Sequence, residues 1–172
     1  MIFSKLLNKF GVKSSKTEKI ESLENQIFLN MKLSLNELYS EDVSIKDRLK
    51  PELKSQLEMC RVLESNAKHD KDFDAYEKIK KLENMTSGGL KIISLCEERE
   101  QKHITFSTAQ NEEIKIYCDE ITSTVFSENE NEALRSAFRQ KQIRRMQKGK
   151  CTVESGLLYL DVIETLSKLR SY

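Results

Sequence analysis

Apolar residues recur at steps of three and four along most of the chain, which is the spacing of one face of an α-helix. The clearest such stripe starts at Ile20 and runs through Leu23, Ile27, Phe28, Met31, Leu35, Leu38 and Tyr39. The same spacing predicts further helices around residues 53–63, 73–85, 90–103, 114–125, 134–146 and 153–169. We therefore expect an all-α fold, a bundle of about seven helices that includes a short amphipathic helix at the N-terminus.

Serine residues followed three positions later by Glu or Gln predict three helix starts, because each side chain then bonds the backbone N–H of the other residue in a capping box. These pairs are Ser15 with Glu18, Ser107 with Gln110 and Ser127 with Glu130. Gly149 is typical of the residue just after a helix, so the helix that follows Ser127 should end there.

Proline, aspartate and glycine predict three other helix boundaries. Pro51 fits the first turn of a helix, where its missing N–H would be unpaired anyway, and this implies a break over residues 41–50. Asp70 can cap the start of the next helix. The adjacent Gly88 and Gly89 should end that helix, because glycine disfavours helix interiors and favours the position just after a helix.

Residues 2–10 form an amphipathic arm that is separable from the rest. Gly11 offers a stop and the Ser/Lys-rich stretch after it is typical of a linker, so we divide the chain into an arm with linker, 1–14, and a helical bundle domain, 15–172. The arm suits a hydrophobic groove of the protein itself or of a partner, and equally a membrane surface. Its shape resembles the short amphipathic leader of the ESCRT-III and phage-shock-protein family, a resemblance that ends near residue 30. The apolar stripe, with Lys5 and Lys9 off it, consists of Ile2, Phe3, Leu6, Leu7 and Phe10.

Composition narrows the classes of fold and function. With Gly 5 and Pro 1, turn residues are too few for sandwiches, barrels or Gly-rich nucleotide loops. Charged residues make up 33% of the chain, which suits long, well-solvated helices. The 29 basic and 28 acidic side chains nearly cancel, so any attraction to nucleic acid or to an anionic membrane must be local.

The cysteines and the apolar runs bear on location. Cys60, Cys96, Cys118 and Cys151 are too dispersed for a paired zinc signature and too few for a disulfide-stapled mini-protein, so we expect reduced thiols, mostly in helix cores. No apolar run reaches the length of a membrane-spanning helix, and no export signal is evident at the start. These features predict a cytoplasmic protein that is at most peripheral to a membrane.

Two histidines restrict acid–base and metal chemistry. His69 with Asp70 resembles the His-Asp pair of the HD phosphohydrolases, but that pattern needs an earlier histidine and none precedes His69. We therefore favour structural roles, with His69 as a cation at the end of one helix and Asp70 as the cap of the next. Glu100 and His103 are three residues apart and share a face with apolar residues, as the Glu-x-x-His ligands of ferritin-like di-iron bundles do. They are weak metal candidates because a second such motif is missing, and we predict no metal and no cofactor.

The segment 135–150 is the strongest local charge anomaly, since it holds seven basic residues and no acid. Successive steps of about 100° scatter these charges around a helix and leave a narrow apolar seam, so we expect the helix to protrude. The basic helix is suited to bind the phosphates of a nucleic acid, or an acidic protein surface such as the Glu128, Glu130 and Glu132 cluster of another copy. A solvated helix whose charges complement its dipole explains the same pattern. The basic residues are Arg135, Arg139, Lys141, Arg144, Arg145, Lys148 and Lys150.

The sequence thus predicts a non-enzymatic helical protein that binds a protein partner or itself. It has no nucleotide-binding loop and no nucleophile elbow, and we expect no small-molecule substrate. Such a protein would act as an adaptor, a chaperone-like protein or an assembly subunit, through the arm and the basic helix. Two alternatives stay open: peripheral membrane binding through residues 2–10, and nucleic-acid binding through residues 135–150.

Overall fold

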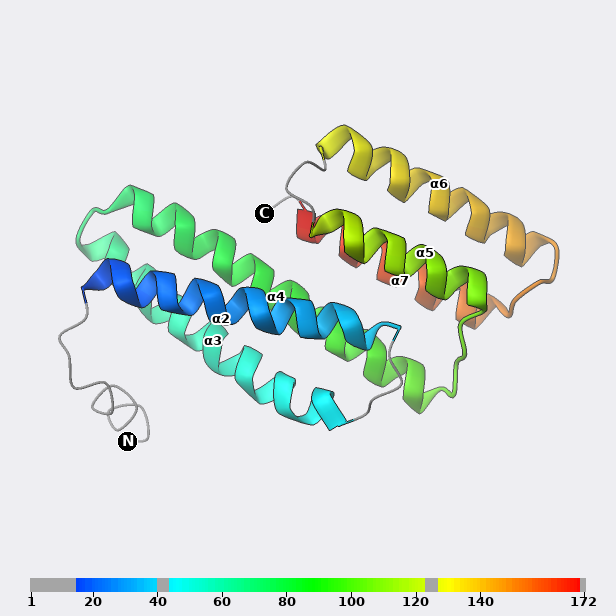
Figure 1. Ribbon diagram of the computed structural model, residues 1–172, viewed down its shortest axis with the longest axis horizontal. Helices are drawn as coiled ribbons and strands as arrows, with labels where there is room; N and C mark the ends of the chain where they lie inside the picture. The colour runs from blue at the N-terminus through cyan, green and yellow to red at the C-terminus, as the bar shows by residue number, and fades with distance from the viewer. Residues whose placement is uncertain (1–14, 40–43, 123–126, 171–172) are drawn as a thin grey trace.

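The computed structural model of the protein describes residues 15–39, 44–122 and 127–170 (Figure 1). Within these ranges the chain forms six helices and no strand, so the predicted all-α class is confirmed. The predicted amphipathic helix at residues 2–10 lies outside the described residues. The helices are α2 (Lys16–Glu37), α3 (Ser44–His69), α4 (Phe73–Gln101), α5 (Thr108–Ile121), α6 (Glu128–Gln147) and α7 (Val153–Arg170).

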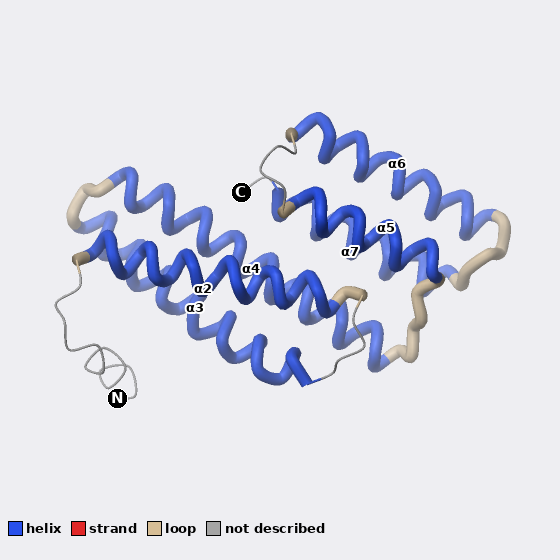
Figure 2. Tube along the Cα trace, in the orientation of Figure 1, coloured by secondary structure: helices blue, strands red, loops and turns tan. Residues whose placement is uncertain are grey.

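The helices form two groups of three that meet along α4 and α7. In one group α2 and α3 pack on α4, and in the other α5 and α6 pack on α7. Figure 2 shows the two groups side by side, and they contact each other through α4 and α7. One apolar cluster runs through both groups, from Leu35 of α2 and Ile92 of α4 to Tyr117 of α5 and Tyr159 of α7. The two groups therefore share one core.

An ion pair at each end of α4 links it to the start of a neighbouring helix. The Nζ atom of Lys16, at the start of α2, lies 3.1 Å from a carboxylate oxygen of Asp70 and 3.1 Å from one of Asp72, just before α4. At the other end, Lys102 Nζ lies 3.7 Å from a carboxylate oxygen of Glu154, in the first turn of α7. The start of α2 and the start of α7 are therefore separated by the whole length of α4.

The three predicted capping boxes are confirmed. Ser15, Ser107 and Ser127 each accept a hydrogen bond from the backbone N–H three residues on, and the Glu or Gln at that position accepts one in return. Gly149 lies just beyond α6 with a φ of 63°, as a glycine at a helix end should. The starts of these three helices depend on local hydrogen bonding, because the serine and its partner are three residues apart in the sequence. This spacing is the same whatever the helix packs against.

The boundary predicted at Pro51 is wrong. Helix α3 begins at Ser44, so Pro51 lies in its interior and residues 44–50, assigned to a break, are helical. A proline in a helix interior loses one backbone hydrogen bond and costs about 3 kcal/mol. Leu49 and Leu53, on either side of it, are completely buried, so packing on the neighbouring helices outweighs that local cost.

The helix end predicted at Gly88 and Gly89 is also wrong, since both lie inside the continuous helix α4. Each glycine stands where another helix comes close. A Cβ atom at Gly88 would overlap the side chain of Leu169 on α7, and one at Gly89 would lie 3.3 Å from Leu53 on α3. These glycines therefore permit close helix packing, and they do not act as caps.

The cap of α4 is Asp72, whereas the sequence favoured Asp70. The Asp72 carboxylate accepts a hydrogen bond of 3.1 Å from the backbone N–H of Ala75. That bond and the hydrogen bond from Lys16 hold the pKa of Asp72 below its ordinary value. Asp70 accepts a second hydrogen bond from Lys16, so it ties α2 to the turn before α4.

His103 follows α4 in the left-handed backbone conformation, with a φ of 52°. Replacing it with glycine should raise the free energy of unfolding by about 0.5 to 1 kcal/mol, because an L side chain is strained there and glycine is not. Chemical denaturation measures the change. As a control, Gln101→Gly in the last turn of α4 should lower stability, since a right-handed helical residue gains nothing from glycine. Destabilisation by His103→Gly would contradict the expectation.

Candidate functional site

The basic helix α6 does not protrude from the bundle as the sequence predicted, because it lies along α7 and also contacts α5. Only three of its side chains are buried, and two of these, Asn131 and Gln142, are polar. Phe138 is the third and packs edge-on against Tyr117, with ring centroids 6.0 Å apart. Polar contacts therefore replace much of the apolar seam that a helix usually needs for docking.

Glu113 of α5 is the centre of these polar contacts. Its side chain is almost completely buried, and its carboxylate accepts hydrogen bonds of 2.7 and 2.8 Å from the guanidinium of Arg145. The hydroxyl of Tyr159 donates a third hydrogen bond of 2.6 Å, and Lys141 Nζ lies 3.5 Å away. One buried carboxylate thus joins α5, α6 and α7.

Burial opposes the ionisation of Glu113, but the hydrogen bonds from Arg145 and Tyr159 outweigh it, so the pKa of Glu113 lies below its ordinary value of 4.5. Burial, and then the hydrogen bond to Glu113, raise the pKa of Tyr159. Both groups are therefore held in their ordinary neutral-pH forms, a carboxylate and a phenol. Their arrangement serves to hold three helices together.

Two more polar contacts extend along the same side of α6. Gln142 accepts a hydrogen bond of 3.1 Å from Gln110 of α5 and donates one of 3.2 Å to the Cys151 Sγ atom. Near the other end of α6, Asn131 accepts a hydrogen bond of 2.6 Å from the Tyr117 hydroxyl. Asn131 also donates one of 3.0 Å to the backbone carbonyl of Ser167. We call this set the polar seam of α6: Gln110, Glu113, Tyr117, Asn131, Gln142, Arg145, Tyr159 and Ser167.

The seven predicted basic residues do not form one surface. Arg145 and Lys141 lie against Glu113, and Arg135 binds Glu132 at 2.8 Å and Glu164 at 3.0 Å. Of the four that form no ion pair within the described ranges, Arg139 and Arg144 are about 140° apart around the helix. Arg139 and Arg144 are therefore on different sides of α6, and Lys148 and Lys150 follow its last residue, an arrangement that does not suit the tracking of a phosphate backbone. The four are Arg139, Arg144, Lys148 and Lys150, and all are exposed.

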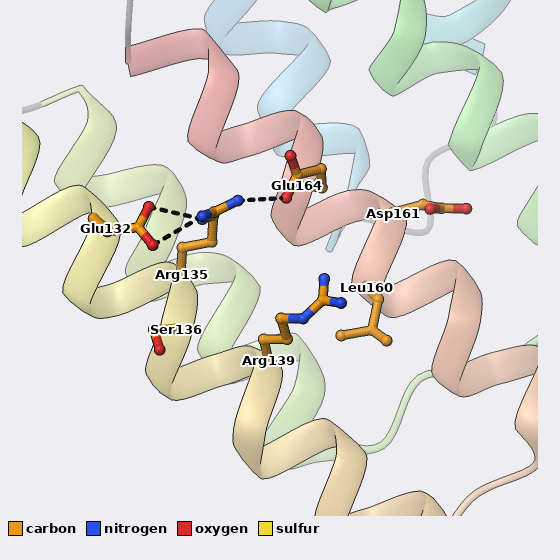
Figure 3. Close-up of a pocket in the computed structure, with 7 residues that line it drawn as sticks. All are labelled: Glu132, Arg135, Ser136, Arg139, Leu160, Asp161 and Glu164. Atoms are coloured by element: carbon orange, nitrogen blue, oxygen red, sulfur yellow. Dashed lines mark hydrogen bonds and ion pairs between the residues drawn. The ribbon is translucent and has the colours of Figure 1, made fainter.

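A shallow groove runs between α6 and α7 on the side away from α5, with a volume of about 450 Å³ (Figure 3). At one end, Arg135 bridges the groove from Glu132 to Glu164, whereas the Arg139 guanidinium reaches toward Leu160 without such a partner. We call this the α6–α7 groove, and its lining residues are Glu132, Arg135, Ser136, Arg139, Leu160, Asp161 and Glu164.

Next to the groove, the first two turns of α7 carry exposed apolar side chains. Val153 is 66% exposed and Leu157, one turn later, is 55% exposed. Two acids accompany them: Glu154, whose side chain is 59% exposed, and Asp161, which is exposed and lines the groove. We call these four residues the open face of α7. Other large apolar side chains are exposed as well, among them Phe28, Leu29 and Phe73, but the two on α7 are distinguished by the groove beside them.

The structure places the weak metal candidates, Glu100 and His103, at the surface and not inside the bundle. Glu100 pairs with Lys46 of α3, and His103 lies beyond the end of α4. Both are exposed, so the expectation that they point inward is wrong, because the helix ends before His103. They line a second shallow hollow of about 400 Å³ with Arg99, Ile104 and Thr105. Within the described ranges no three His, Cys, Asp or Glu side chains are grouped to hold a metal ion.

The cysteines match the expectation of free thiols. Cys60, Cys96 and Cys118 are buried and unpaired in any disulfide, and Cys151 is half-buried. Burial raises the pKa of Cys60 and of Cys96 to about 11, and that of Cys118 to about 12. These three thiols therefore remain protonated at neutral pH, and an unactivated buried thiol is a poor nucleophile.

The predicted contact residues of the arm, Ile2, Phe3, Leu6, Leu7 and Phe10, lie outside the described residues. Among the helices that are described, none is long and apolar enough to cross a lipid bilayer. Comparisons of the chain with models of protein families, with curated proteins and with solved structures return no match.

Sequence reasoning missed the open face of α7 and the polar seam of α6. One signal for the seam was present, since Gln110 and Glu113 share the helical stripe of Ile114 and Tyr117. A charged residue within an apolar stripe indicates a buried ion pair, and it could have been matched with a cation of the following helix. The open face gave no comparable signal, because Val153 and Leu157 continue the apolar stripe of α7.

Proposed function

We propose that this protein is a non-catalytic interaction component, an adaptor or assembly subunit, and that it binds its partner through the open face of α7. The observation that supports this most directly is the exposure of Val153 and Leu157, one turn apart beside the α6–α7 groove. Both side chains are already partly covered, so burying the exposed remainder on binding contributes about 1 to 2 kcal/mol for each.

The surroundings of these two residues support a protein partner as well. Leu160 extends the apolar surface into the groove, and the charges of Arg139 and Asp161 stand at its edge. Apolar residues at the centre with polar residues at the rim are the usual composition of a protein interface. The polar seam holds α6 and α7 in register, so the two sides of the groove are in place before a partner arrives.

The double variant Val153→Ser/Leu157→Ser should lose the partner while keeping the fold, because both side chains are largely exposed. We expect at least tenfold less of the main co-purified protein than with the wild-type chain, measured by quantitative mass spectrometry of affinity-purified tagged protein. The matched control is Phe28→Ser on α2, which removes another exposed apolar side chain, 48% exposed, from a different surface. Equal recovery of every co-purified protein by all three chains would refute the proposal.

A further inference from the structure

The open face of α7 combines apolar and acidic side chains. Val153 and Leu157 lie beside Glu154 and Asp161 on the same side of α7, and both acidic residues are exposed. Asp161 makes no ion pair within the described ranges, and Glu154 has a single long one of 3.7 Å to Lys102. Such a face suits an amphipathic helix that carries cations beside its apolar stripe.

The arm at residues 2–10 has this complementary pattern in its sequence. Lys5 and Lys9 are spaced one helical turn apart, and the segment contains no acid. Its charge is therefore opposite to that of Glu154 and Asp161. The apolar residues of the stripe recur at the spacing that anchors a helix in a groove: Ile2, Phe3, Leu6, Leu7 and Phe10.

The arm of the same molecule cannot reach this face as a helix. The start of α2 is held at the N-terminal end of α4 by Lys16 and Asp72, and the start of α7 is held at the C-terminal end by Lys102 and Glu154. A helix of 29 residues, the length of α4, spans about 44 Å. Even if residues 2–10 were helical and residues 11–14 fully extended, the arm would reach less than about 30 Å. The arm that meets an open face must come from another molecule.

We propose that residues 2–10 of one molecule bind the open face of α7 in a second copy of this chain. This rests on the proposed function, because it names the partner of that same face. The contact is heterologous, since an arm meets a face, and each molecule offers one of each. Repetition of the contact generates open chains of molecules, or closed rings where the geometry permits.

Sedimentation velocity of the full chain over a range of concentrations tests the proposal. The wild-type protein should associate, and Leu6→Glu/Leu7→Glu and Val153→Ser/Leu157→Ser should each weaken association at least tenfold. An equimolar mixture of the two variants should form one-to-one complexes and nothing larger, because only one intact arm and one intact face remain per pair. The matched control is Leu6→Glu/Leu7→Glu alone at the same total concentration. It should stay monomeric, because that sample contains no intact arm.

Charge substitutions test the orientation of the contact. Lys5→Glu/Lys9→Glu should weaken association, and combining it with Glu154→Lys/Asp161→Lys in the same chain should restore it. Arg139→Glu, which turns the nearest cation of the groove into an acid, should strengthen the binding of the basic arm. An external acidic partner would respond to Arg139→Glu in the opposite direction.

Three results would overturn the inference: a wild-type protein that is monomeric at all concentrations, an inert mixture of the two variants, or arm substitutions without effect on association. A further contrary result is an arm variant that loses flotation with phosphatidylcholine–phosphatidylserine vesicles and still self-associates. A monomeric protein whose open-face variant nevertheless loses a co-purified partner would leave the proposed function standing, so the two failures are distinguishable.

Discussion

Replacing Glu113 with alanine should lower the free energy of unfolding by about 3 kcal/mol, because the guanidinium of Arg145 is then left without its partner in a buried site. The Tyr159 hydroxyl also loses its acceptor. For a chain of this size the change corresponds to a fall in the melting temperature of about 6 to 12 °C. Urea denaturation followed by circular dichroism measures it. The neighbouring variant Glu112→Ala removes an exposed carboxylate and should change stability by less than about 0.5 kcal/mol.

The double variant Glu113→Leu/Arg145→Leu separates the loss of a partner from the loss of the pair. It should recover most of the stability that Glu113→Ala loses, because no unpaired charge remains.

The pH dependence of stability that Glu113 causes has a defined sign. Because the pKa of Glu113 is lowered by folding, its contribution is complete above the ordinary value of 4.5 and is lost as the pH falls through the folded-state value. Glu113→Gln should therefore flatten the acid limb of the stability curve, and an unchanged limb would contradict this account.

Replacing Gly156 with leucine should lower the free energy of unfolding by about 2 kcal/mol, because α6 and α7 have no room for a side chain there. Gly156 is buried in α7, and a Cβ atom would overlap the side chain of Met146 and lie 3.0 Å from Gln142 Nε2. Gly156→Ala tests the balance of two effects. Alanine favours the helix by about 1 kcal/mol, and this offsets part of the overlap with the flexible Met146 side chain.

Met146→Ala in the same chain provides the control for Gly156→Leu. Removing the side chain that the leucine meets should restore at least half of the lost stability, whereas Met146→Ala alone should destabilise the protein slightly. Melting temperatures of the four chains give the coupling between the two positions. Strictly additive losses would show that the close approach of α6 to Gly156 is not the cause.

Features within one turn of helix could be predicted from the sequence, whereas features that depend on helix packing could not. The capping boxes at Ser15, Ser107 and Ser127 depend on residues three apart, and the structure confirms all three. The boundaries predicted at Pro51 and Gly88 rest on the preference of proline and glycine for helix ends, which is the same in every helix. Packing decides both cases: Leu49 and Leu53 of the same helix are buried on either side of Pro51, and Leu169 of α7 lies against Gly88.

The candidate site shows the same division. The basic character of α6 is evident in the sequence, but its pairing is not, because Glu113 is 32 residues from Arg145 and Glu164 is 29 from Arg135. The open face of α7 is harder still to predict. Whether Leu157 is exposed depends on where α4 and α6 stand around α7, and a helical stripe does not show which of its apolar residues remain uncovered.

The polar seam has a thermodynamic consequence for α6. Water can replace most of the hydrogen bonds that hold this helix, and only Phe138 among its apolar side chains is fully buried. Swinging α6 away would therefore carry a small heat-capacity change and a small denaturant dependence for a segment of this length. The docking of this one helix should therefore respond to pH and ionic strength more than to temperature, whereas the rest of the bundle has the ordinary apolar behaviour.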